Sequence, residues 1–230
     1  MTNRSQSEMK AKSSVPTSTW FRLDDAKRQR VLQAAMQEFG EHGYSTGSLN
    51  TIAREAEIAK GSLFQYFADK QEFFAHVCDE ASRRIRTDME GRIATLDLDQ
   101  SFTDWLTEVC FAWSEYFADH PLERSVTAAT NLEIDNVVRA VVRATAELHY
   151  VEVIRPLIQM WRDRDAIRPD ADDDVLLSLL LILLPHLALA PYYDGLDAVF
   201  GLRGRTPEEQ RPIIRRILSG LSPVFQPATS

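Results

Sequence analysis

The chain has 230 residues, of which 44% are hydrophobic and 26% are charged. This composition is typical of a globular protein with a sizeable core and excludes a disordered chain. The net charge of −8 excludes a uniformly basic surface, but the charge is unevenly distributed. Residues 1–19 carry +2, residues 20–86 carry ten basic and ten acidic groups, and residues 87–230 carry −10. The N-terminal third can therefore still face phosphate.

Three features indicate a cytoplasmic protein that does not contact a membrane. The first ten residues contain no apolar run of the kind found in signal peptides. Cys78 and Cys110 have no CxxC or CxH partner, which favours free thiols. The apolar run over residues 175–193 approaches the length of a spanning helix, but Pro185 and Pro191 interrupt it. A helix that is apolar all round is also typical of a buried core, and we favour that interpretation.

The predicted elements are all helical, because no segment shows the alternation of a strand. Residues 1–19, rich in Ser, Thr, Lys and Pro, are expected to form a flexible tail. We expect Pro156 to kink or break a long helix. The predicted helices cover residues 24–41, 48–56, 60–67, 71–96, 101–120, a short stretch from 121, 132–164, 175–190 and 207–221. The sequence therefore predicts an all-α fold.

Residues 48–67 contain two short helical patterns separated by a four-residue break. Each pattern has one apolar face, formed by Leu49, Ile52, Ala53 and Ala56 in the first and by Leu63, Phe64 and Phe67 in the second. Helices this short are unstable alone, so each needs the other and a third helix behind them. A tight helix pair with a polar second helix is the geometry of a helix-turn-helix that reads a DNA major groove. The alternative is an ordinary helical hairpin inside an all-α core.

The pattern A-x-x-x-F-G-E-H-G-Y, followed by S-L-N-T-I-A and K-G-S-L-F-Q-Y-F-x-x-K, resembles the TetR family of transcriptional regulators over about residues 24–84. The resemblance implies a homodimer that binds a near-palindromic double-stranded DNA operator, with repression as the usual outcome. It implies a helix-turn-helix domain over residues 20–70, with its motif at about 47–67. It also implies that residues 71–225 form a helical domain for ligand binding and dimerisation.

The resemblance also indicates which residues contact DNA. In the second helix of the motif, Lys60, Ser62 and Gln65 would face base edges or nearby phosphates, and Gln65 can pair with adenine. Tyr66 and Lys70 would contact phosphate. The complete predicted set is Ser48, Lys60, Gly61, Ser62, Phe64, Gln65, Tyr66 and Lys70.

Four positions depart from the family pattern. Gly47 stands where threonine is common, and Phe64 stands where tyrosine is frequent. Glu57 replaces the glycine often found in the turn, which predicts backbone strain. Ala59 removes a usual serine cap. These departures weaken the contact list but leave the predicted fold unchanged.

Aromatic side chains are dense in the helix over residues 101–120 and in the segment 148–161. The predicted ligand-binding residues are Trp105, Trp113, Phe117, His149, Tyr150, Met160 and Trp161, with Asn131 as a further polar anchor. A mostly apolar cavity would suit a small apolar effector such as a fatty acid, an acyl-CoA or a hydrocarbon. Arg139, Arg143 or Arg155 could meet one carboxylate. The alternative is that these aromatic residues simply pack the core.

The helices over residues 175–190 and 207–221 are apolar beyond the needs of one packed face. Two copies of each would form a four-helix bundle about a two-fold axis, so we predict the dimer interface there. Leu180 and Ile214 represent this interface.

Catalytic motifs are absent from the sequence. The five histidines show no HxxxH or HExxH spacing, and there is no GxSxG, P-loop or GxGxxG pattern. We therefore expect no enzyme activity, no cofactor and no metal. Two alternatives stay open: a helical regulator controlled by a protein partner or by a metal ion near Asp172–Asp174, and a helical ligand-binding module that does not bind DNA.

Overall fold

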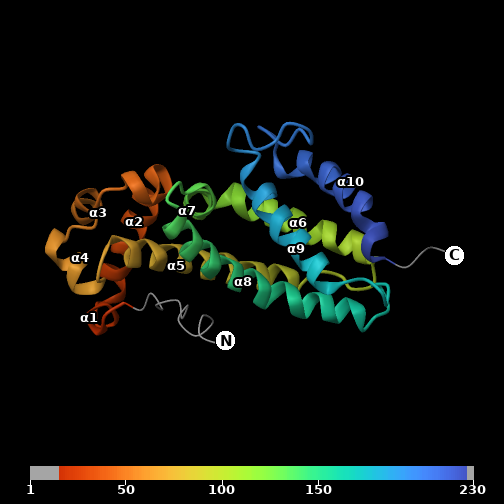
Figure 1. Ribbon diagram of the computed structural model, residues 1–230, viewed down its shortest axis with the longest axis horizontal. Coiled ribbons are helices and arrows are strands. Elements are labelled where there is room, and N and C mark those ends of the chain that lie inside the picture. The colour runs from red at the N-terminus through yellow and green to blue at the C-terminus, as the bar shows by residue number, and fades with distance from the viewer. Residues whose placement is uncertain (1–15, 227–230) are drawn as a thin grey trace, which may run out of the picture.

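The computed structural model of the protein describes residues 16–226 and is built from α-helices (Figure 1). They are α1 (Ser18–Phe21), α2 (Asp25–Thr46), α3 (Leu49–Glu55), α4 (Lys60–Tyr66), α5 (Lys70–Ile93), α6 (Phe102–Asp119), α7 (Pro121–Leu132), α8 (Asn136–Arg162), α9 (Asp173–Leu189) and α10 (Pro207–Phe225). The described residues contain no strand, which confirms the predicted all-α fold.

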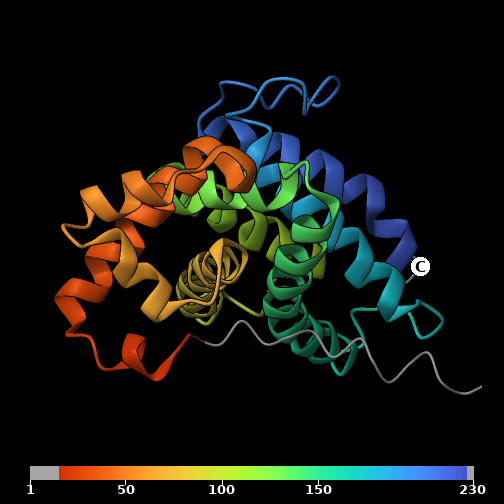
Figure 2. The ribbon, with the colours of Figure 1, turned by 60° about the vertical axis from the view of Figure 1, so that its left-hand side comes forward.

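Helices α1 to α4 gather at one end of the molecule, and α5 runs from that end along its length (Figure 1). Figure 2 shows α5 almost end-on, between the N-terminal helices and α8. Helices α6, α9 and α10 form the other end, where α10 packs on α6 (Figure 1). The chain therefore has a small N-terminal unit and a larger helical unit, joined by α5 and by the packing of α7 on α2.

The two units have separate hydrophobic cores, and both cores use α5. The first half of α5, including Phe73, Phe74 and Ala81, packs into the N-terminal core together with Phe39 and Ile52. The second half of α5 packs with α6, α8 and α9 in the C-terminal core. The N-terminal core also takes in side chains of α7 and α8, namely Val126, Ala129, Val138 and Val142. A domain division at residues 70 and 71 therefore cuts the chain at the start of a helix whose first half belongs to the N-terminal core.

The start of the N-terminal unit differs from the prediction. Residues 1–15 of the expected tail lie outside the described residues, but Pro16 is buried and Thr17 hydrogen-bonds to α4. The Thr17 N–H donates to the Tyr66 carbonyl at 2.9 Å, and the Thr17 hydroxyl donates to the Gln65 carbonyl at 2.6 Å. Helix α1 follows and buries Trp20 against Tyr66 and Phe67. The described part of the expected tail therefore contacts α4 through Thr17.

Pro156 does not break α8, so of the expected kink or break the break is absent. Helix α8 is continuous across this residue. Pro156 cannot donate a hydrogen bond to the carbonyl four residues earlier, which is that of Glu152. Both residues lie on the exposed side of α8, so water can satisfy the freed carbonyl. The opposite side of the helix packs along α5 and keeps the helix intact.

Candidate nucleic-acid interface and effector cavity

Helices α3 and α4 form the predicted helix-turn-helix. The Ser48 hydroxyl caps α3 by accepting a hydrogen bond from the Thr51 N–H at 3.3 Å. Ile52, Ala53 and Leu63 are buried in the N-terminal core, so the two helices share one apolar support. Ala59 gives α4 no side-chain cap. The first-turn N–H groups of α4 therefore have no cap from this residue, which leaves the positive end of the helix open to an anion.

Most of the predicted DNA-reading residues share the outer face of α4. Lys60, Gly61, Phe64 and Gln65 are exposed, with Phe64 at 52%, and Ser62 is half-buried. An exposed phenylalanine among polar side chains can contact a thymine methyl group. This face therefore combines hydrogen-bonding groups with one apolar contact.

Tyr66 lies off the exposed face of α4, and Lys70 lies at the start of α5 beside the end of α2. Tyr66 is only 3% exposed and packs on Trp20 with ring centroids 5.8 Å apart, so its ring supports the domain instead of lying on the reading face. Lys70 Nζ lies 3.4 Å from the Ser45 carbonyl and 4.9 Å from the centre of the Tyr44 ring. Partial burial lowers the pKa of Lys70. Lys70 therefore lies at the edge of the reading surface and contacts Tyr44 and Ser45 at the end of α2.

Gly47, one of the departures from the family pattern, lies in a crowded position. A Cβ atom there would lie 2.6 Å from the Gly43 carbonyl and 2.8 Å from Phe39 Cδ1. The close approach follows from the end of α2, where Gly43 adopts φ of 68°. A threonine at position 47 would displace this end of the helix.

Glu57 adopts φ of 56° in the turn between α3 and α4, as its replacement of glycine predicted. The left-handed region is strained for a side chain with a Cβ atom. Glu57→Gly should therefore raise the free energy of unfolding by about 1 kcal/mol. Urea denaturation would measure this, with Glu55→Gly as the control. The control removes a glutamate from α3 and should destabilise the protein, and a loss of stability in Glu57→Gly would contradict the strain.

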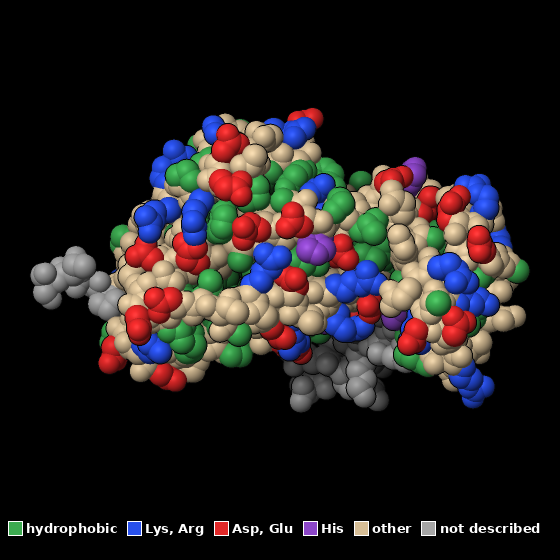
Figure 3. Space-filling view, turned by 180° about the vertical axis from the view of Figure 1, so that it is seen from behind, with side chains coloured by type: hydrophobic (Ala, Val, Ile, Leu, Met, Phe, Trp, Pro, Cys, Tyr) green, Lys and Arg blue, Asp and Glu red, His purple; other side chains and the backbone are tan. Residues whose placement is uncertain are grey.

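Basic and acidic side chains are interspersed at the end of the molecule formed by the N-terminal helices, on the face that Figure 3 shows. This agrees with the equal numbers of basic and acidic groups in residues 20–86. On this face there is no broad basic patch, so any contact with DNA there would depend on particular residues.

A cavity lies inside the C-terminal unit, between α5, α6, α7, α8 and α9. Its empty volume is about 920 Å³, including space open to solvent. Trp113, His149 and Tyr150 of the predicted ligand-binding set line it, as do Asn131 and Arg143. Sequence periodicity missed the wall given by α5 and α9, whose small and aliphatic residues carry no chemical signature. This wall includes Ala81, Ser82, Ile85, Met89, Leu181 and Leu184.

The other four predicted ligand-binding residues do not line the cavity. Trp105 and Trp161 pack on each other with ring centroids 5.3 Å apart, and Phe102 and Phe225 extend this cluster. Phe117 is fully buried behind Trp113, and Met160 packs on the outside of the core. Aromatic density alone does not separate a cavity wall from a packed core.

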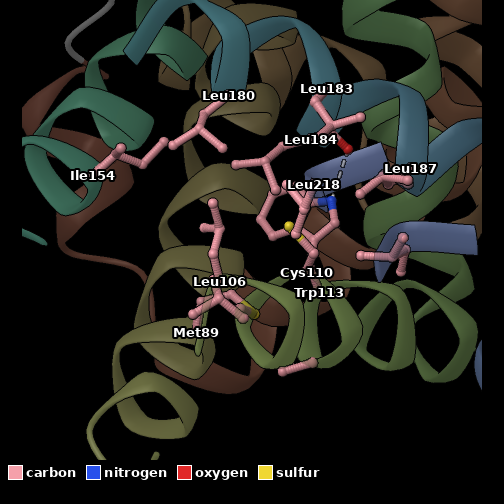
Figure 4. Packing of buried hydrophobic residues seen from close by; sticks show 14 of the residues in the cluster. Met89, Leu106, Cys110, Trp113, Ile154, Leu180, Leu183, Leu184, Leu187 and Leu218 are labelled. Atoms are coloured by element: carbon pink, nitrogen blue, oxygen red, sulfur yellow. Dashed lines mark hydrogen bonds between the residues drawn. The ribbon is translucent and has the colours of Figure 1, made fainter. Parts of the chain in front are cut away.

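Leu180 and Ile214 are core residues of the single chain and cannot represent a dimer interface. Their side chains are 6% and 0% exposed, and both belong to the C-terminal core. Figure 4 shows Leu180 within the same cluster as Ile154 and Met89. The outer face of α9 instead presents Val175 and Ile182.

The aspartates before α9 act as caps and ion-pair partners. Asp172 accepts hydrogen bonds from the N–H groups of Asp174 and Val175, Asp173 pairs with Arg162, and Asp174 pairs with Arg155. Among residues 16–226 no group of three His, Cys, Asp or Glu side chains is placed to hold a metal ion. In the same range, no helix has the length and apolar character needed to cross a bilayer.

The geometry defines a two-domain helix-turn-helix protein with an internal cavity. Residues 31–77, within the N-terminal unit, match the family model of bacterial regulatory proteins, tetR family. The HTH-type transcriptional regulator HbdR of Aromatoleum sp. (strain CIB) is 34% identical over 30% of this chain and 32% of its own length. The A-factor receptor protein of Streptomyces griseus is 22% identical over 81% of this chain and 62% of its own length.

The fold extends the similarity beyond the N-terminal domain. The fatty acid degradation regulator FadR from Bacillus halodurans has a TM-score of 0.65 and 15% identity, covering 84% of this chain and 97% of that chain. This likeness shows the fold alone. The sequence matches to HbdR and to the A-factor receptor protein span about a third and 62% of those proteins.

Proposed function

We propose that the protein is a DNA-binding transcriptional regulator that represses its target and releases the operator when a small apolar molecule occupies the cavity. The observation that carries the proposal is the pairing of an exposed polar α4 face with a cavity walled by α5 and α7. These two helices also pack into the N-terminal core, so the cavity and the reading face share structural elements. Relatives described as HTH-type regulators support the same conclusion.

The proposed regulator acts as a homodimer on a near-palindromic operator. One α4 can read only one half-site, and a two-fold dimer presents two such helices to successive major grooves. Exposed apolar side chains on α9 and α10, which include Val175, Ile182 and Val224, support an interface on these helices. This proposal keeps the predicted helices but replaces the residues that represent them.

The effector is proposed to be mainly apolar because aliphatic and aromatic side chains form most of the cavity wall. A fatty acid, an acyl-CoA and a hydrocarbon all belong to this class. The FadR neighbour is described as a fatty acid degradation regulator, and another relative is described as an A-factor receptor. These descriptions support a small-molecule effector in general, without selecting one.

Hydrogen bonds join the end of α2 to the end of α7, and we call this contact the joint. It could transmit a movement of the cavity wall to the reading face. The buried Glu133 carboxylate accepts hydrogen bonds from the Tyr44 N–H at 2.8 Å and from the Ser45 hydroxyl at 2.9 Å. Asn131, two residues before Glu133, lines the cavity. An effector that moves the end of α7 would therefore move the end of α2 with it. Complete release requires the effector to prefer the released state by about 5.5 kcal/mol.

The reading face is tested by comparing two substitutions on operator and random DNA. Gln65→Ala should relax specificity at one base position and cost about 1–3 kcal/mol on the operator alone. Lys70→Ala should weaken binding to both DNAs alike and lower the salt slope by about 1. Gln159→Ala, an exposed glutamine on α8, serves as the control. Equal losses on operator and random DNA for Gln65→Ala would contradict the placement of α4 in the groove.

The decisive experiment for the function is a mobility shift with DNA from upstream of the protein's own gene, with and without a panel of apolar compounds. A shift that the panel reverses is the expected result. No binding to any DNA would favour a helical module that does not bind DNA. Binding that responds only to a metal ion or a protein would contradict the apolar effector.

A further inference from the structure

The cavity has a polar end and an apolar end, and the order of residues along α8 sets this polarity. Helix α8 contributes a stripe at helical spacing, in which Arg143, Glu147 and Tyr150 come before Ile154 and Leu157. Arg143 of this stripe hydrogen-bonds to Asn131 of α7, and Thr127 and Thr130 of α7 also line the cavity. Ile154 and Leu157 pack in or against the C-terminal core together with Met89, Ile93 and Leu184, which also line the cavity. An occupant that matches both ends has a polar head near α7 and an apolar body beyond it.

The cationic groups of the cavity wall are already paired. Arg143 Nη1 donates to Asn131 Oδ1 at 2.6 Å, and Arg143 Nη2 donates to Glu147 Oε1 at 2.9 Å. Arg86 pairs with Glu90 and with Glu152. A carboxylate head would have to compete with Glu147 for Arg143 and would bring a second negative charge beside it, which is unfavourable in a partly buried site.

Two other polar groups at the polar end of the cavity have no hydrogen-bond partner within the protein among the described residues. Among the described residues, the Tyr150 hydroxyl forms no hydrogen bond, and His149 Nδ1 is buried without a partner. Burial raises the pKa of Tyr150, so its hydroxyl stays neutral and can both donate and accept. His149 Nε2 donates to Asp79 Oδ1 at 2.9 Å, and this hydrogen bond lowers the pKa of Asp79. The free hydrogen-bonding capacity of the Tyr150 hydroxyl is therefore uncharged.

We propose that the cavity takes an amphipathic molecule with an uncharged hydrogen-bonding head, such as a hydroxyl group, which binds the Tyr150 hydroxyl while the apolar body lies between Met89, Leu157 and Leu184. The inference rests on the proposed function, since it names the chemical class of the effector at the same cavity. It separates members of the apolar class by their heads: an alcohol satisfies the free groups without disturbing the pair of Arg143 and Glu147, whereas a fatty acid does not.

The test compares 1-octanol, octanoate and octylamine, three probes with one chain length and different heads. Isothermal titration calorimetry on the full-length protein should show octanol binding about tenfold or more tightly than either charged probe. Tighter binding of octanoate or octylamine than of octanol would overturn the inference, as would the absence of binding by all three.

Two variants locate the head. Tyr150→Phe keeps the ring and removes the hydroxyl, so octanol affinity should fall about threefold to tenfold. Glu147→Gln removes the competing carboxylate from Arg143, so octanoate affinity should rise about tenfold while octanol affinity changes little. Glu115→Gln, at a carboxylate paired with Arg92 outside the cavity wall, should leave all three affinities unchanged. An unchanged octanol affinity in Tyr150→Phe, or an unchanged octanoate affinity in Glu147→Gln, would place the head elsewhere and overturn the inference.

The mobility shift separates this inference from the proposed function. Octanol that binds with the expected preference and releases DNA supports both. Octanol that binds with the expected preference but leaves the DNA complex intact supports the head-group site and contradicts ligand-released repression. Release of DNA by octanoate with higher potency than by octanol supports the regulator and contradicts the head-group site.

Discussion

Ile182→Glu should give a folded monomer that has lost most of its affinity for a palindromic operator. Ile182 lies on the outer face of α9 and is 72% exposed in the single chain, so a glutamate there meets water in the monomer. In the proposed dimer the same charge would be buried against the partner subunit without a counter-ion. Loss of the second reading head should weaken operator binding roughly 100-fold or more.

Ile214→Glu should have a different and larger effect. Ile214 lies on α10, and its side chain is fully buried in the C-terminal core. A glutamate there leaves an unpaired charge inside the single chain, which costs more than about 4 kcal/mol and should unfold it. The two substitutions introduce the same side chain, so the difference between their results isolates the role of the position.

Light scattering and circular dichroism distinguish the two outcomes. Ile182→Glu should halve the molar mass and keep the helical spectrum, whereas Ile214→Glu should lose the spectrum or aggregate. Gln159→Glu, at an exposed position on α8, should leave mass and spectrum unchanged. A dimeric Ile182→Glu protein with normal operator affinity would place the interface on another surface.

The difference between Ile182 and Ile214 shows why the sequence predicted where the helices lie in the chain better than which of their faces are buried. Hydrophobic periodicity located both α9 and α10, because apolar spacing depends only on neighbours along one helix. Helix α9 is apolar on almost every side, so the pattern could not distinguish the face that packs within the chain from the face left outside. That distinction depends on the placement of α6 and α8, which are distant in sequence.

The candidate sites follow the same logic. Lys60 and Gln65 lie on the exposed side of α4 as expected, because Leu63 fixes the buried side, whereas Phe64, which the periodicity assigned to the apolar face, is exposed. Tyr66 was misplaced because α1, which covers it through Trp20, was too short to show periodicity. Of the aromatic residues predicted on α8, Tyr150 lines the cavity, whereas Trp161 packs on Trp105 in the core. The sequence could not separate them, because the difference lies in the residues that face each of them from other helices.

Glu133→Ala should destabilise the joint between the two units by about 2–4 kcal/mol. The Glu133 side chain is almost fully buried, with 4% of the residue exposed. It accepts hydrogen bonds from the Tyr44 N–H, the Ser45 hydroxyl and the Asp135 N–H. Removing the carboxylate leaves these donors without their protein partner. Urea denaturation measures the loss, and Glu115→Gln is the control for a more exposed carboxylate.

The pH dependence of stability gives a second measure of the same carboxylate. Burial alone would raise the pKa of Glu133, but hydrogen bonds from Asp135, Ser45, Tyr44 and Ile134 together lower it below its ordinary value of 4.5. A carboxylate with a lowered folded-state pKa stabilises the protein above its unfolded-state pKa, and this contribution is lost as the pH falls through the folded-state pKa. Glu133→Gln removes the titrating group. Its free energy of unfolding should therefore fall less than that of the wild type between about pH 5 and pH 3, and equal slopes would contradict the lowered pKa.

The joint should also determine how the effector acts on DNA. Arg139 Nη1 donates to the Glu133 carbonyl at 2.7 Å, and Asn131 joins the same turn to Arg143 at the polar end of the cavity. In Glu133→Gln the cavity wall keeps all its residues, so effector affinity should stay within about twofold of the wild type. The neutral amide accepts weaker hydrogen bonds from Tyr44 and Ser45, so movement of α7 should be transmitted less strongly to α2. The concentration of effector that releases half of the operator should therefore rise, while its calorimetric affinity does not. A parallel change in both quantities would mean that Glu133 only supports the fold.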